Sequence, residues 1–77
     1  MADLNGISEA LQKGDRDTVA KLVQAAVNEG LSPKKILDEG LIAGMSIIGK
    51  KFKNNEVYVP EVLIAARAMH GGMNILE

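Results

Sequence analysis

Apolar residues recur every three or four positions along most of the chain, and no segment alternates apolar and polar residues over the length of a strand. This spacing is typical of amphipathic helices, and it predicts helices over about 3–13, 15–29, 33–52 and 60–76. The breaks between them are short, and short connections place neighbouring helices roughly antiparallel. The predicted fold class is therefore all-α: a small four-helix bundle that takes in residues 1–77 as one domain.

Residues at the expected helix ends support these boundaries. Asp3, Asp15 and Ser32 each stand where a side-chain oxygen can cap the first turn of a helix. Gly14 and Gly30 stand where the first two helices end, a position at which glycine is common. The helix limits are therefore expected to follow these residues closely.

Three glycines, Gly40, Gly44 and Gly49, lie inside the third predicted helix. Each costs about 1 kcal/mol of helix stability relative to alanine. Close approach of a neighbouring backbone or of a ligand would offset that cost, and we favour tight helix–helix packing.

The fourth predicted helix begins at Pro60, which suits the first helical position. Its expected buried stripe is Leu63, Ala66, Met69, Met73 and Leu76. Gly71 and Gly72 fall inside this pattern and are expected to fray or kink the last turns. The apolar run 73–76 near the last residue suggests a piece of a longer protein.

The connection between the last two helices is less polar than such a turn normally is. Phe52 stands at its entrance, and Val57-Tyr58-Val59 leads out of it to Pro60. Val59 has no side-chain acceptor with which to cap the helix, so another role must favour it. With Val62, these residues converge at one end of the bundle, either as a plug or as an exposed binding surface.

Lys50, Lys51 and Lys53 surround Phe52. Cations are favourable at a helix C-terminus, which explains the cluster by itself, and we favour that reading over attraction to an anionic partner. The 9 basic and 10 acidic residues give a formal net charge of −1, which argues against a nucleic-acid binder. No apolar run approaches the roughly 20 residues of a membrane span. The absence of cysteine fits a cytoplasmic location.

Catalytic side chains are scarce. The chain has no cysteine and a single histidine, His70, which we expect to be a partly exposed helix residue without a metal or a catalytic partner. We expect no catalysis by this segment alone. The 3% aromatic content implies a thin aliphatic core, so we expect a partner surface.

The order and spacing of several motifs resemble a known family. They are Gly40-Leu41-Ile42-Ala43-Gly44-Met45, Ile48-Gly49-Lys50-Lys51-Phe52, Val57-Tyr58-Val59-Pro60-Glu61 and Ala65-Ala66-Arg67-Ala68-Met69. Together they look like the helical cap domain of cobalamin-binding methyl-transfer proteins. That group includes the corrinoid proteins of methylamine and methanol methyltransferase systems and cobalamin-dependent methionine synthase.

The resemblance implies a cap that shields the upper face of methylcobalamin. Phe52 matches the phenylalanine that shields the upper axial ligand, while Val59 and Val62 match aliphatic residues that face the corrin. Tyr58 and Met69 are implied as neighbours. A protein-interaction or oligomerisation bundle that uses the same apolar end is the alternative.

The family's lower cobalt ligand comes from an Asp-x-His-x-x-Gly motif in a following α/β domain, and that motif is absent here. His70 lacks this context and is not predicted to be a ligand. Cobalamin would then be bound mainly by the following domain, with this chain as a fragment of the longer protein. Methyltransferases are the implied partners, within a cobalamin-dependent methyltransferase system.

Overall fold

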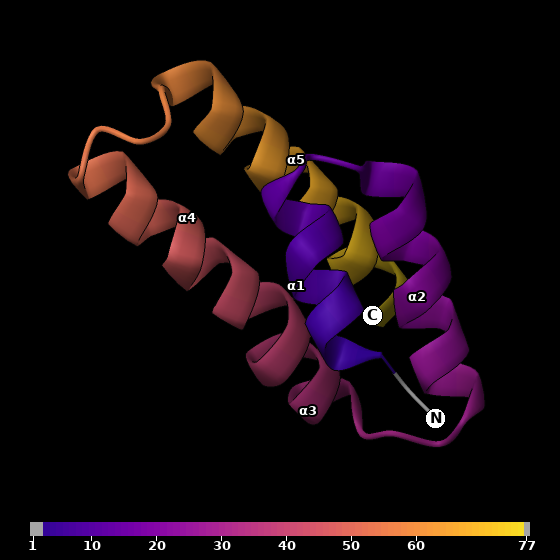
Figure 1. The fold of residues 1–77 in the computed structure, drawn as a ribbon. Helices are drawn as coiled ribbons and strands as arrows, with labels where there is room; N and C mark the ends of the chain where they lie inside the picture. Colours follow the sequence, from indigo (N-terminus) through magenta and orange to yellow (C-terminus); the bar gives the residue numbers. More distant parts are fainter. Residues whose placement is uncertain (1–2, 77) are drawn as a thin grey trace.

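The computed structural model describes residues 3–76, which form helices joined by short turns (Figure 1). The elements are α1 (Leu4–Gln12), α2 (Arg16–Asn28), α3 (Pro33–Ile36), η1 (Leu37–Ile42), α4 (Ala43–Lys53) and α5 (Val59–Leu76). Since α3, η1 and α4 follow one another without a break, they make a single long helix. Successive helices run up and down (Figure 1), so the predicted all-α four-helix bundle is confirmed for the described residues.

The predicted caps are confirmed. The Asp3 carboxylate accepts a hydrogen bond from the Gly6 backbone N–H at 2.7 Å. Asp15 accepts from the backbone N–H of Thr18 at 3.2 Å and from its hydroxyl at 2.7 Å. These hydrogen bonds hold the pKa of Asp15 below its usual value, and the one from the Thr18 hydroxyl has the larger effect. The Ser32 hydroxyl accepts from the Lys35 N–H at 3.2 Å.

The first two helices end as the glycines predict. Gly14 and Gly30 have φ angles of +73° and +87°, in the left-handed region that glycine adopts without strain. The α1–α2 and α2–α3 connections are therefore tight, which keeps these helices close together.

The sequence predicts one helix over 33–52. The structure interrupts its α-helical geometry, because residues 37–42 form a π-helical turn. Two of its three glycines pack against α1. A Cβ at Gly40 would lie 3.1 Å from Ile7 Cγ2, and one at Gly44 would lie 3.0 Å from the Ser8 carbonyl oxygen. Tight helix packing is therefore confirmed for these two. A Cβ at Gly49 would meet nothing within 4 Å.

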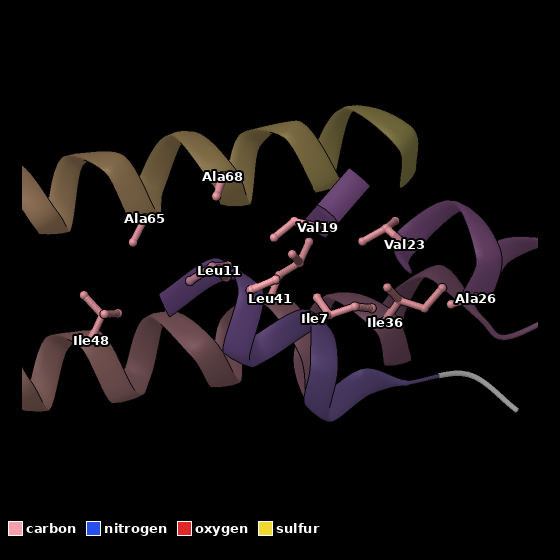
Figure 2. Close-up of a cluster of buried hydrophobic side chains, with 11 residues drawn as sticks. Ile7, Leu11, Val19, Val23, Ala26, Ile36, Leu41, Ile48, Ala65 and Ala68 are labelled. Atoms are coloured by element: carbon pink, nitrogen blue, oxygen red, sulfur yellow. The ribbon is translucent and has the colours of Figure 1, made fainter. Parts of the chain in front are cut away.

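The core lies where α1, α2 and the long helix meet (Figure 2). Its largest fully buried side chains are aliphatic: Ile7, Leu11, Ile36, Leu41, Ile48, Val19 and Val23. Among the buried residues, the fourth helix adds only the small side chains of Ala65 and Ala68 (Figure 2). Its larger apolar residues are partly buried and pack against the edge of the core: Val62, Met69, Met73, Ile75 and Leu76. The fully buried large aliphatic residues thus come from the first three helices.

The stripe predicted for α5 is wrong at Leu63, which is exposed. Met69, Met73 and Leu76 are half-buried and pack against the core, so they lie at the edge of the buried face and not at its centre. The fully buried face consists of small residues: Ala65, Ala68, Gly71 and Gly72. The reason is close packing, since α5 lies along α2 and there is no room for a larger side chain.

The two adjacent glycines of α5 demonstrate this closeness. A Cβ at Gly71 would lie 2.8 Å from Arg16 Cγ, and one at Gly72 would lie 2.9 Å from Leu41 Cδ2. The expected fraying is also wrong, because α5 continues through both glycines to Leu76. Packing against α2 and Leu41 offsets the poor helix propensity of glycine at these positions.

Candidate functional site

The last turn of α4 and the first turns of α5 project beyond α1 and α2 at one end of the molecule (Figure 1). Residues 54–58 connect the two helices, and Asn55 lies in the left-handed region with a φ angle of +62°. This connection holds the end of α4 beside the start of α5. Residues separated by a polar turn in the sequence are thus placed at the same end of the molecule.

Large apolar side chains stand exposed on this projection, and we call them the apolar tip: Phe52, Tyr58, Val59 and Leu63. Their exposed fractions are 46%, 71%, 55% and 55%. Side chains that plugged the end of the bundle would be buried, so the structure favours the binding-surface alternative. Large apolar residues exposed at one end of a small domain commonly mark a site of interaction.

The predicted residues Val62 and Met69 lie differently. Both are half-buried and pack against the core cluster. Val62 is three residues after Val59, so it lies on the same face of α5 at the base of the tip. Met69 follows two helical turns later, about 10 Å farther along the axis, so it belongs to the body of the bundle. The structure thus places Phe52, Tyr58, Val59 and Val62 at the same end of the bundle, and Met69 farther along α5.

The start of α5 differs from the prediction by one residue. Val59 is its first residue, and Pro60 is the second. The Glu61 carboxylate accepts a hydrogen bond from the Tyr58 backbone N–H at 3.4 Å. With Val59 inside the helix, the capping position is Tyr58, and Glu61 contacts its backbone as the third helical residue does in a capping box.

Sequence reasoning missed Leu63 and Ile64. Leu63 lies four residues after Val59, so helical spacing from Val59 could have placed it on the exposed face. Ile64 is exposed as well, but its side chain covers Gly14, and it lines a pocket of about 270 Å³ with Gln12, Lys13 and Glu61. Charged ends of Lys13 and Glu61 make that pocket a poor match for an apolar group.

The remaining polar candidates add little chemistry. Lys50, Lys51 and Lys53 occupy the last turn of α4, where the helix dipole favours cations. His70 is exposed on α5. Within residues 3–76, no group of three or more His, Cys, Asp or Glu side chains could hold a metal ion. Glu77 lies outside the described residues. The tip is thus suited to covering an apolar group rather than to moving protons.

None of the helices described in residues 3–76 is both long enough and apolar enough to cross a membrane. Most of the exposed large apolar side chains lie at the end of the α4–α5 hairpin, with lysines in the last turn of α4, while Ile42 and Ile47 are exposed farther back on the long helix. An exposed apolar surface on a folded bundle is typical of a site that contacts a ligand or another protein surface.

Residues 3–77 match the protein-family model described as "B12 binding domain". Over 77 residues the chain is 38% identical to a corrinoid protein of Desulfitobacterium hafniense, covering 100% of this chain and 36% of that protein. It is 39% identical over 72 residues to monomethylamine corrinoid protein 2 of Methanosarcina mazei, covering 94% of this chain and 33% of that one.

The solved structure of the Methanosarcina barkeri monomethylamine corrinoid protein matches with a TM-score of 0.87 and 27% identity. That match covers 91% of this chain and 33% of the other. This chain therefore spans about a third of the length of the corrinoid proteins that it matches.

Proposed function

Because the chain belongs to the family of B12 binding domains, we propose that its apolar tip covers the upper face of methylcobalamin during methyl transfer. The observation that carries this proposal is the exposure of Phe52 and Val59 at the end of a well-packed bundle. No part of residues 3–76 buries these two side chains, so a surface outside those residues would have to cover them. In a family of B12 binding domains, the face of a bound corrinoid is such a surface.

Cobalamin is the cofactor that the family match and the corrinoid relatives support, so that prediction is confirmed. The side chains of the tip fit such a group. Phe52, Val59 and Leu63 are purely apolar, and the exposed Tyr58 adds one hydroxyl. When bound, the corrinoid supplies a cobalt-held methyl group, which is itself apolar. An aliphatic and aromatic cover therefore matches it without leaving an unpaired polar atom.

The residues of this chain would then have separate tasks. Phe52 and Val59 exclude water from the methyl group, because neither can hold a water molecule by a hydrogen bond. Val62, half-buried at the base of the tip, supports Val59 from the next turn of α5. A cover of this kind must move aside for transfer, as lids over reactive groups do.

The proposal includes two partners. One is a following α/β cobalamin-binding domain in a longer protein, supported by relatives about three times the length of this chain. The other is a methyltransferase, supported by relatives whose names specify monomethylamine, dimethylamine and trimethylamine. The methyl donor of this protein is not implied by those names, since all three kinds match.

The test uses the longer protein that carries this segment, loaded with methylcobalamin. Replacing Phe52 and Val59 with alanine (Phe52→Ala with Val59→Ala) should speed photolysis and oxidation of the bound cofactor, because water and oxygen reach it more easily. The matched control is Ile47→Ala. Ile47 is also exposed on α4, but lies about 140° around the helix from Phe52.

An unchanged photolysis rate in the double variant would contradict the proposal. Loss of assembly in size-exclusion chromatography, with photolysis unchanged, would instead support a protein-interaction or oligomerisation bundle that uses the same tip.

A further inference from the structure

Gly49 is the one glycine of the long helix that packing does not explain. Gly40 and Gly44 are buried against α1, and both have neighbouring atoms where a Cβ would stand. Gly49 is exposed, and a Cβ there would meet nothing within 4 Å. Its φ angle is not positive, so backbone geometry does not require glycine either. Within residues 3–76, the bundle would accept alanine at this position and gain helix propensity.

Its place on α4 is informative. Gly49 lies four residues after Met45 and three before Phe52, so all three share one flank of the helix. Met45 packs against the core, and Phe52 stands exposed at the tip. On this side of α4, Gly49 therefore exposes backbone between a residue that packs on the core and a residue of the tip. This exposed backbone adjoins Phe52, one of the two side chains that the proposed function places over the methyl group.

Helical side chains lean toward the N-terminus of their helix, so Phe52 leans toward the turn that contains Gly49. Even so, no atom of Phe52 comes within 4 Å of the Cβ position at Gly49. The space beside Gly49 is thus open to a ligand or to another part of the protein outside residues 3–76. A backbone without a side chain permits the close approach of a broad, flat group.

We propose that Gly49 is a positioning residue, whose bare backbone lets the edge of the corrin ring approach α4 beside Phe52. This rests on the proposed function, because it takes the tip to be the surface that covers the cofactor. A side chain at position 49 would hold α4 away from the ring. Phe52 would then no longer reach the methyl group, although the bundle itself would be undisturbed.

The experiment uses the full-length protein with the substitutions Gly49→Ala and Gly49→Met. In the cobalamin-free protein, Gly49→Ala should leave the thermal midpoint unchanged or raise it by about 2–4 °C. With methylcobalamin bound, photolysis should become faster than in the parent, and more so for methionine than for alanine. Ala25→Met is the matched control, since it adds a side chain to the exposed surface of α2.

Two results would overturn the inference. One is a parental photolysis rate in both Gly49 variants while Phe52→Ala accelerates photolysis, in which case the proposed function stands without the role of Gly49. The other is a lowered thermal midpoint in the cobalamin-free Gly49→Ala protein, which would give the glycine a role in the fold. If Phe52→Ala also leaves photolysis unchanged, the proposed function itself fails.

Discussion

The body of the bundle and its apolar tip use large apolar side chains in opposite ways. In the body, α1 and α2 turn residues such as Ile7, Leu11 and Val19 inward, where they are fully buried. At the tip, Phe52 and Val59 face outward although they are as apolar as the core. The difference separates two tasks: the body supplies the stability of the domain, and the tip leaves exposed the surface for which we propose a contact with the corrinoid.

The α5 helix takes part in both regions. Its small residues face the bundle and let α5 pack closely on it, while Val59 and Leu63 are exposed. A helix that is apolar on most of its faces normally has more than one neighbour. For α5, one neighbour is the bundle and the other is the body that we propose to lie against the tip.

The largest expected effect separates a core leucine from a tip leucine. Leu41→Ala removes a fully buried side chain and should lower the free energy of unfolding by about 2–5 kcal/mol. Leu63→Ala removes an exposed one and should change it by no more than about 0.5 kcal/mol. Urea denaturation followed by circular dichroism measures both. Equal losses in the two variants would contradict the division between body and tip.

A smaller effect distinguishes two glycines of the same helix. Gly44→Ala forces a Cβ to within 3.0 Å of the Ser8 carbonyl oxygen, so crowding should outweigh the gain in helix propensity. We expect a net loss of about 1 kcal/mol. Gly49→Ala meets nothing and should gain up to about 1 kcal/mol. Chemical denaturation gives both values, and changes of the same sign would show that α1 does not pack as described.

The smallest effect concerns the cap of α2, in the body. Hydrogen bonds from Thr18 hold the pKa of Asp15 below its usual value. The stabilisation from this carboxylate is therefore complete above the unfolded pKa of about 3.9 and is lost as the pH falls through the lower folded-state pKa. Asp15→Asn keeps a capping side chain but cannot titrate.

Below about pH 4, the thermal midpoint of the parent should therefore fall more steeply than that of Asp15→Asn. Melting curves recorded over a pH series in the same buffers make the comparison. Parallel pH profiles would show that the carboxylate gains nothing from its contacts with Thr18.

The sequence was most informative where one residue decides the local structure. Asp3, Asp15 and Ser32 predicted three helix starts, because a cap acts within a single turn. Gly14 and Gly30 predicted two helix ends for the same reason. These local signals need no knowledge of the tertiary structure, and all five are confirmed.

Prediction was wrong about the centre of the buried face of α5 and did not include the π-helical turn, because contacts distant in the sequence determine both. Apolar residues cover most of α5, so their spacing alone does not single out one buried face. Side-chain size decides it instead, since only small residues fit against α2 and Leu41. The recurrence of Ala65, Ala68 and Gly72 at intervals of three and four was the available signal. The π-helical turn packs Gly40 on Ile7, a contact that no local pattern reveals.

For the site, the family resemblance named the residues, and the fold determined how they are arranged. Phe52, Tyr58, Val59 and Val62 gather at one end because residues 54–58 bring α4 and α5 together there. Met69 was named only as a neighbour, and its distance along α5 separates it from the tip. Exposure, which distinguishes a binding surface from a plug, depends on which helices cover the tip and could not be predicted from spacing.

The most direct test of the contrast between body and tip is hydrogen–deuterium exchange of the longer protein, with and without methylcobalamin. Peptides that cover the tip, from Phe52 to Leu63, should exchange more slowly when the cofactor is bound, because the cofactor shields and orders this connection. Peptides from α1 and α2 should exchange at the same rate in both states. Unchanged exchange at the tip, with protection confined to other parts of the protein, would contradict the claim that the tip covers the corrinoid.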